Sequence, residues 1–172
     1  MISVIDIIGD IVRGLNEKVG FPVNYIFGDR DYIAKALNQI LQTPETERLA
    51  FPFICLYPFV EDRTDRNWHC KTSLDLIMAV DTQADFTNEM RKDISFKQRL
   101  HPVYNAFIEA ILKDKRLDFA GYGRHVPHQY SENYRYGHFK PEMLHPEFKH
   151  RIDAIDLTRV QINVKGNCNG KN

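Results

Sequence analysis

The sequence has few cysteines, no excess of either charge and no long apolar run. Its three cysteines, Cys55, Cys70 and Cys168, are an odd number at wide spacing, whereas a disulfide scaffold or a cysteine zinc site needs close, paired spacing. Lys plus Arg and Asp plus Glu both total 23, and proteins that grip nucleic acid normally carry a basic excess. We therefore expect reduced, idle thiols and no direct sequence-specific nucleic-acid partner.

Apolar runs such as 2–8 and 51–60 fall short of the roughly 20 residues that cross a bilayer. The first residues also lack a cationic start and a small-residue cleavage site, so we expect neither a signal peptide nor a membrane partner. The chain has 172 residues, of which 43% are hydrophobic and 12% aromatic. That is enough for one domain with a core, and it excludes a wholly disordered chain.

Apolar residues recur at helical spacing in three segments. Residues 4–19 form the first, with Gly20 at the position that favours a helix end. Residues 31–42 form the second, before Thr43-Pro44. The third is the longest stretch, from residue 86 to Leu112, and Pro102 lies inside it. Because proline interrupts helical hydrogen bonding, we expect a break near His101 with a fresh helix start.

Strand patterns cover residues 23–27, 51–59, 68–81, 125–130 and 151–165. Apolar residues alternate with polar ones most clearly in 74–81, which predicts one face toward a core. In the last strand, Ile155 and Leu157 are apolar at odd positions, but Val160, Ile162 and Val164 are apolar at even ones. A β-bulge near Thr158-Arg159 would return both sets to one buried face.

The order of these elements predicts an α+β fold, a mainly antiparallel sheet with amphipathic helices packed on one face. Strands 51–59 and 68–81, joined by the charged loop 61–67, are expected to pair as an antiparallel hairpin. We expect a single domain over 1–172. We expect residues 121–150 to be a strand and loop addition to this domain, and residues 166–172 to be a polar tail.

Histidines in segment 125–150 offer the main alternative, a metal-dependent hydrolase that uses His125, His128 and His138. Against it, residues three apart on a strand face opposite ways, and the H-E-x-x-H helix is absent. His69 and Cys70 are adjacent and so diverge on a strand, and no G-x-S-x-G elbow exists. Gly121-Tyr122-Gly123 precedes no helical pattern and does not predict a phosphate loop. We therefore expect no enzyme, no catalytic residue, no cofactor and no metal site.

Two segments have the composition of protein contact surfaces, where tyrosine and arginine are enriched. The run 130–136 is one, and its alternative explanation is an edge strand, in which tyrosine is also common. The charged loop 61–66 is the other, and a merely solvated loop tip is its alternative. The candidate contact residues are Glu61, Asp62, Arg63, Asp65, Arg66, Tyr130, Tyr134, Arg135 and Tyr136.

The layout resembles the tail terminator, or tail completion, proteins of long-tailed bacteriophages and prophages. The resemblance rests on a strand that opens Phe51-Pro52 and has Tyr57 near its end, the charged loop 61–67, and Trp68. The alternating strand 74–80, the helix to Leu112 and the strand that begins Asp156-Leu157-Thr158 complete it. It covers most of residues 1–165, with helix 31–42 and segment 121–150 as additions.

The resemblance implies a structural virion protein that acts by shape and contact, with no inherited catalytic residue. It would form a homo-oligomeric ring, a hexamer, that caps the tail tube. Its implied partners are itself, the tail-tube protein and the head–tail connector protein. It would be made in the bacterial cytoplasm and reside in the tail or neck of the virion. Another neck or tail-tube protein, and an adaptor without a viral role, are the alternatives.

Overall fold

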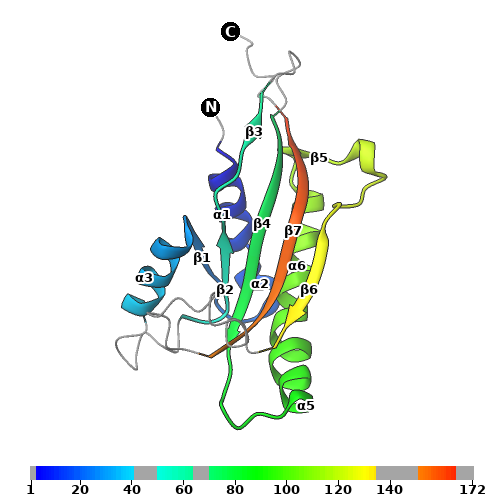
Figure 1. Ribbon diagram of the computed structural model, residues 1–172. Coiled ribbons are helices and arrows are strands. Elements are labelled where there is room, and N and C mark those ends of the chain that lie inside the picture. The colour runs from blue at the N-terminus through cyan, green and yellow to red at the C-terminus, as the bar shows by residue number, and fades with distance from the viewer. Residues whose placement is uncertain (1–2, 41–49, 64–69, 135–150, 166–172) are drawn as a thin grey trace.

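The computed structural model describes residues 3–40, 50–63, 70–134 and 151–165. Its helices are α1 (Val4–Arg13), α2 (Leu15–Val19), α3 (Arg30–Ile40), α5 (Asn88–Met90), the π-helix η1 (Arg91–Leu100), α6 (His101–Lys113) and the 3-10 turn η2 (Ala120–Tyr122). Its strands are β1 (Asn24–Phe27), β2 (Phe53–Leu56), β3 (Glu61–Asp62), β4 (Cys70–Asp81), β5 (Leu117–Asp118), β6 (Gln129–Asn133) and β7 (Ile152–Val164). The predicted α+β class is confirmed (Figure 1).

One sheet joins these strands in the order β1-β2-β4-β7-β5, with β3 on β4 and β6 on β7. The 12-residue β4 and the 13-residue β7 run side by side along its centre (Figure 1). The predicted hairpin is confirmed, because β2 pairs antiparallel with β4. β1 pairs parallel with β2, and the other pairings among the described strands are antiparallel.

The predicted β-bulge is confirmed, and its position decides which side chains of β7 are buried. Leu74 pairs with Val160 but Leu76 pairs with Leu157, so two residues of β7 oppose one of β4. Arg159 takes φ 55° there, and its N–H donates to Oδ1 of Asp75 at 2.9 Å. The extra residue returns Val160 to the same core as Leu157.

The two faces of the sheet bury different helices. One face packs against α1, α2, η1 and α6 through a large core, whose members on β4 are Cys70, Leu74, Leu76, Met78 and Val80. The other face is smaller, and its core contains Ile33 of α3 together with Phe53 and Ile77. The helices expected on one face are thus divided, because the odd-numbered Ile77 and Ala79 of β4 are also apolar and need cover.

The first helical segment ends as expected, at Gly20 with φ 79°. Gly14 separates α1 from α2 within it. Gly9 has a packing role, because a Cβ there would lie 3.1 Å from the ring of Tyr25. The Tyr25 hydroxyl donates to the carbonyl of Ile5 at 3.1 Å, so β1 is fixed against α1.

A new helix, α6, begins at His101 as expected, but the expected break in helical conformation there is wrong. Leu100 and His101 both have right-handed helical dihedrals, and α5, η1 and α6 follow one another directly. Hydrogen bonding changes from π to α type at this point, as the His101 N–H still bonds the carbonyl of Phe96, five residues earlier. Pro102 has no N–H, and the missing donor falls where the pattern changes, so the helix continues.

A fully buried ion pair connects the start of η1 to the start of β7. Nη1 of Arg91 lies 3.0 Å from Oδ1 of Asp153, and both side chains are 0% exposed. Arg91 also donates from Nε to the carbonyl of Phe86 at 3.1 Å and from Nη2 to that of Gln83 at 2.7 Å. One side chain thus holds the β4–α5 loop, the long helix and β7 together.

Removing one charge of this pair should be costly. Asp153→Ala leaves the guanidinium of Arg91 buried without its counter-charge, and we expect a loss of about 3–5 kcal/mol in unfolding free energy. Urea denaturation followed by circular dichroism measures the loss. The matched control, Asp81→Ala, breaks the partly exposed pair with Arg99 and should cost less than about 1 kcal/mol. Equal losses from the two variants would contradict this expectation.

The bulge makes a second prediction. A side chain at positive φ is strained and glycine is not, so Arg159→Gly should keep the unfolding free energy or raise it by up to about 1 kcal/mol. Arg159→Val should lower it by about 1–2 kcal/mol, since a β-branched residue disfavours that conformation. The same denaturation experiment compares the two variants, and matching stabilities for Gly and Val would refute the assignment of strain.

Candidate functional site

A cluster of polar aromatic side chains lies where edge strand β6 meets the long helix. We call it the edge-strand cluster: His101, Tyr104, His128, Tyr130 and Glu132. Nε2 of His101 donates to Oε1 of Glu132 at 2.6 Å, and the Tyr130 hydroxyl donates to the same oxygen at 2.7 Å. The rings of Tyr104 and Tyr130 meet edge to face with centroids 5.0 Å apart.

His128 completes the cluster and uses both of its ring nitrogens. Nδ1 donates to the carbonyl of Val126 at 2.7 Å, which leaves Nε2 to accept from the Tyr104 hydroxyl at 2.9 Å. Burial works to raise the pKa of Glu132, but hydrogen bonds from His101 and Tyr130 outweigh it and the pKa is lowered. Burial, followed by the bond to Glu132, raises the pKa of Tyr130.

The predicted contact residues of the tyrosine run separate into two groups. Tyr130 is 40% exposed, so part of its ring is available to a partner. Tyr134 is half-buried and packs on Phe96 with ring centroids 4.5 Å apart, which ties it to the core. Arg135 and Tyr136 lie outside the described residues.

The charged loop begins as a short strand. Glu61 and Asp62 pair with Thr72 and Lys71 of β4, and Arg63 is exposed beyond them. Nε of Arg63 donates to Oε2 of Glu61 at 2.7 Å, so these two charges balance one another. Asp65 and Arg66 lie outside the described residues, and whether the loop contacts a partner stays a prediction.

The histidines of the alternative metal site are only partly described. The rings of His125 and His128 stack with centroids 6.2 Å apart, and the nitrogens of His128 are both in hydrogen bonds. His138 lies outside the described residues. Within the described ranges, no group of three or more His, Cys, Asp or Glu side chains is arranged to hold a metal ion.

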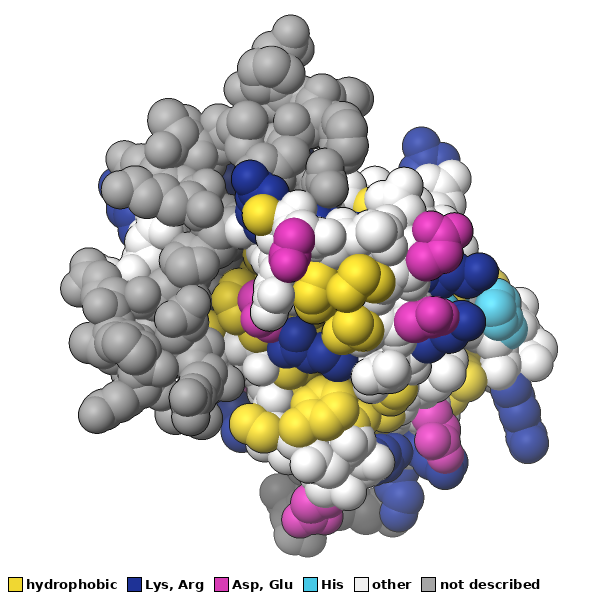
Figure 2. Space-filling view, turned by 90° about the horizontal axis from the view of Figure 1, so that it is seen from below, with side chains coloured by type: hydrophobic (Ala, Val, Ile, Leu, Met, Phe, Trp, Pro, Cys, Tyr) yellow, Lys and Arg dark blue, Asp and Glu magenta, His cyan; other side chains and the backbone are white. Residues whose placement is uncertain are grey.

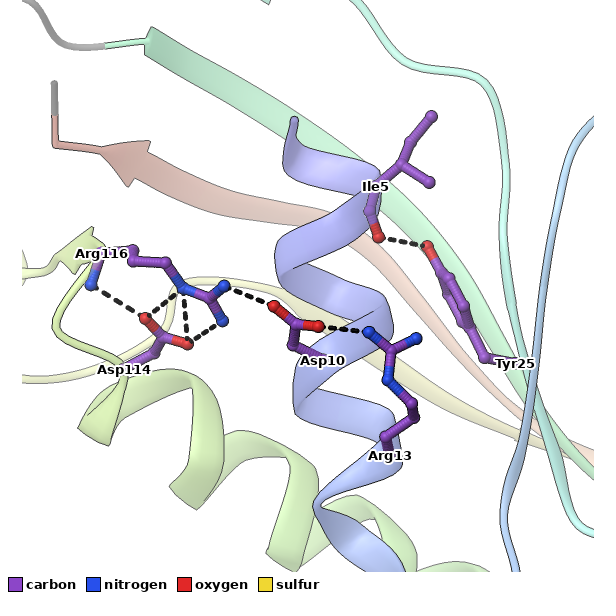
Figure 3. Close-up of polar contacts among 6 residues, drawn as sticks. All are labelled: Ile5, Asp10, Arg13, Tyr25, Asp114 and Arg116. Carbon is purple, nitrogen blue, oxygen red and sulfur yellow. Dashed lines mark hydrogen bonds and ion pairs between the residues drawn. The ribbon is translucent and has the colours of Figure 1, made fainter. Parts of the chain in front are cut away.

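A shallow depression of about 260 Å³ lies between α1, α2 and the end of α6. Its lining is Asp10, Ile11, Gly14, Lys18, Ala110, Lys113, Asp114 and Arg116. Arg116 bridges it: Nη1 bonds Oδ2 of Asp10 at 2.6 Å and Nη2 bonds Oδ2 of Asp114 at 2.7 Å (Figure 3). These charges link residues 106 positions apart and hold α1 against the end of α6.

Neighbouring charges decide the ionisation in this depression. The hydrogen bond from Arg116 lowers the pKa of Asp10, with a smaller effect of Arg13. Burial works to raise the pKa of Asp114, but the bonds from Arg116 lower it overall. Asp10 and Asp114 are thus held as carboxylates by the neighbouring guanidinium. We read the network as structural, because its two carboxylates are paired with Arg116 and join α1 to the end of α6.

A second polar group lies on the face of the sheet that α3 partly covers. Asp156 accepts a 2.7 Å hydrogen bond at Oδ2 from Asn133, and among the described residues no donor reaches its buried Oδ1. Burial raises the pKa of Asp156 to about 6, with Arg30 and Asn133 lowering it and Asp75 raising it. Arg30 itself lies over the ring of Tyr57, 5.8 Å from the centroid.

The end of the molecule that carries α5 has a mixed surface. Viewed from that end, hydrophobic side chains gather near the middle with basic and acidic side chains among them (Figure 2). Met90 of α5 is 40% exposed, and Phe86 just before α5 is half-buried.

Comparison with known proteins does not assign the chain to a family. No family model, curated protein or solved structure matches the chain. In the described ranges, no helix combines the length and the apolar composition that crossing a bilayer requires.

The sequence reasoning missed the pairs that join distant segments. His101–Glu132 and Asp10–Arg116 span 31 and 106 positions, and no local pattern marks such pairs. The one available signal is the helical register of His101, which puts it on the same side of the helix as Tyr104, three residues later. Asp153 gives a different signal, a charge inside an apolar strand, and by itself this pattern predicts a solvated or interfacial carboxylate. That prediction is wrong, because Asp153 is buried against Arg91.

The raised pKa of Asp156 predicts a pH dependence of stability. The folded-state pKa of Asp156, about 6, exceeds the unfolded value of about 3.9. The contribution of this carboxyl to stability is therefore complete below about pH 4 and is lost as the pH rises through 6. Asp156→Asn should therefore raise the unfolding free energy by about 1–2 kcal/mol at pH 8, discounted for partial exposure, and by little at pH 4. Urea denaturation at both pH values measures this.

A matched control uses an exposed carboxylate with the opposite shift. The hydrogen bond from Lys97 lowers the pKa of Asp93, so Asp93→Asn should not stabilise the protein at pH 8. A gain at pH 8 from both substitutions, or from neither, would contradict the role of Asp156.

Proposed function

We propose that the chain is a structural protein of a phage or prophage tail that assembles as a ring on the tail tube, as a tail terminator does. The observation that carries the proposal is where the resembling segments lie in the sheet. The Phe-Pro strand contributes β2, the alternating strand is β4, and the strand that begins Asp156-Leu157-Thr158 is β7. These three are consecutive neighbours in the sheet, so segments far apart in sequence form one central unit.

The edges of the sheet also support the proposal. Within the described residues, β1 and β3 end the sheet on one side, and β5 and β6 end it on the other. A ring requires two different surfaces per subunit that meet and close, and unpaired strand edges are surfaces that proteins cover. The mixed apolar and charged end of the molecule (Figure 2) suits contact with a second protein, such as the tail-tube protein or the head–tail connector.

Light scattering over a concentration series, followed by negative-stain imaging with and without assembled tail tubes, tests the proposal. We expect closed rings of one size, a hexamer by the resemblance, either free or at tube ends. Arg63→Glu, which places a reversed charge beside Glu61 at the exposed β3 tip, should reduce assembly several-fold. Lys97→Glu, a charge reversal on the exposed side of η1, is the matched control and should assemble normally.

The outcome that contradicts the proposal is a chain that stays monomeric and leaves tube ends uncapped. The alternative, a metal-dependent hydrolase that uses His125, His128 and His138, predicts one zinc ion per chain after gentle purification. It also predicts hydrolytic activity that a chelator removes. Metal analysis of the same monomeric preparation therefore distinguishes the two functions.

A further inference from the structure

Strands β1 and β6 are the two ends of one set of rows that cross the sheet, a row being the series of residues that pair from strand to strand. The pairings of β1 with β2, β2 with β4, β4 with β7 and β7 with β6 cover the same part of the sheet. Each residue of β1 therefore lies in a row that ends on β6. The two strands lie at opposite sides of the sheet (Figure 1). Among the described strands, β1 pairs only with β2, and β6 pairs only with β7.

One of these rows is apolar or aromatic from end to end. It lies on the face of the larger core and consists of Phe27, Leu56, Leu76, Leu157 and Tyr130. The three leucines are buried in that core, whereas Phe27 is 48% exposed and Tyr130 is 40% exposed. Each edge of the sheet thus presents a half-exposed aromatic side chain, at the same level and on the same face.

Strand β1 lacks the features that normally keep an edge strand from pairing with another chain. Its sequence over 24–27, NYIF, holds neither a charged residue nor a proline, and both are common protections of an edge. The N–H groups of Asn24 and Gly28 donate to carbonyls on the β2 side, at 2.9 and 3.1 Å. Because backbone groups of successive residues point to opposite sides of a strand, those of Tyr25 and Phe27 point away from β2.

The charges beside the two edges are complementary. The row of Tyr25 ends at Glu132 of β6, whose pKa is lowered. Arg13, with a side chain that is 71% exposed, lies next to Tyr25. A Cβ at Gly9 would lie 3.1 Å from the Tyr25 ring and 3.6 Å from Nη1 of Arg13. Figure 3 shows Arg13 bonded to Asp10, with its other terminal nitrogen turned to the side of Tyr25. A β6 edge beside β1 therefore brings a carboxylate toward this guanidinium.

We propose that β6 of one copy pairs antiparallel with β1 of a second copy, so that the sheet continues from chain to chain with Tyr130 beside Phe27. The strand directions favour this pairing. β1 runs parallel to β2 and each later step to β6 is antiparallel, so β1 and β6 run in opposite directions. The two edges differ, so the contact is heterologous, the type that closes into rings. The pairing rests on the proposed function, because it specifies the contact between subunits of that ring.

Engineered cysteines test the pairing. Within one chain, β1 and β6 are four strand spacings apart, or about 19 Å, and a disulfide needs Cα atoms within about 7 Å. A disulfide between them must therefore join two copies. A Phe27→Cys protein and a Tyr130→Cys protein, both carrying Cys168→Ser, are mixed in the presence of tail tubes and oxidised mildly. Cys55 and Cys70 are buried. We expect linked dimers on a non-reducing gel from the mixture and far fewer from either protein alone.

Tyr122 provides the matched control, because it is 39% exposed, as Tyr130 is, but lies in the turn η2 outside the rows. Tyr122→Cys should not link to Phe27→Cys. A chain that carries both Phe27→Cys and Tyr130→Cys should give a ladder of linked copies. Phe27→Asp, a change at a half-exposed position, should reduce assembly several-fold, whereas Tyr122→Asp should not. Circular dichroism checks that both aspartate variants are folded.

Three outcomes would count against the pairing. Rings or capped tubes without the link between Phe27→Cys and Tyr130→Cys, or with an equal link to Tyr122→Cys, would overturn it and leave the proposed function standing. Links within either single-cysteine protein as abundant as those in the mixture would also overturn it, because like edges would then be in contact. A chain that neither associates nor caps tubes would contradict the proposed function and the pairing together.

Discussion

The pairing of β4 with β7 is the constraint on which the rest of the structure depends. β2 and β3 attach to β4, β5 and β6 attach to β7, and the larger core is built on one side of this pair. The pairing keeps one buried face along its whole length only because the bulge at Arg159 restores the alternation. Without the extra residue, Val160, Ile162 and Val164 would face away from the core.

The buried pair of Arg91 and Asp153 adds the connection that hydrophobic packing alone does not specify. Apolar contacts hold the long helix on the sheet, but such contacts are non-directional. The guanidinium has fixed donor directions, and it bonds two loop carbonyls as well as Asp153. It therefore fixes the distance between the end of β4 and the start of the long helix. It also fixes the start of β7 beside that helix.

Two partly exposed networks of charged side chains also join distant segments. Charges in the depression beside α6 neutralise one another around Arg116 and hold two helices together. In the edge-strand cluster, the His101–Glu132 bond joins a helix to an edge strand of the sheet. The protein is proposed to assemble through the edges of its sheet, so how rigidly edge strand β6 is held affects the contacts made there.

The sequence by itself determined the α+β class, the antiparallel hairpin of β2 and β4, the helix end at Gly20 and the bulge near Thr158-Arg159. Each follows from local periodicity or from a single residue type, which short segments record. Only the tertiary structure decided that α3 covers the opposite face, that the helix runs through Pro102, and that Asp153 is buried. The polar cluster at β6 belongs here too, because its members come from segments whose proximity depends on how the whole chain folds.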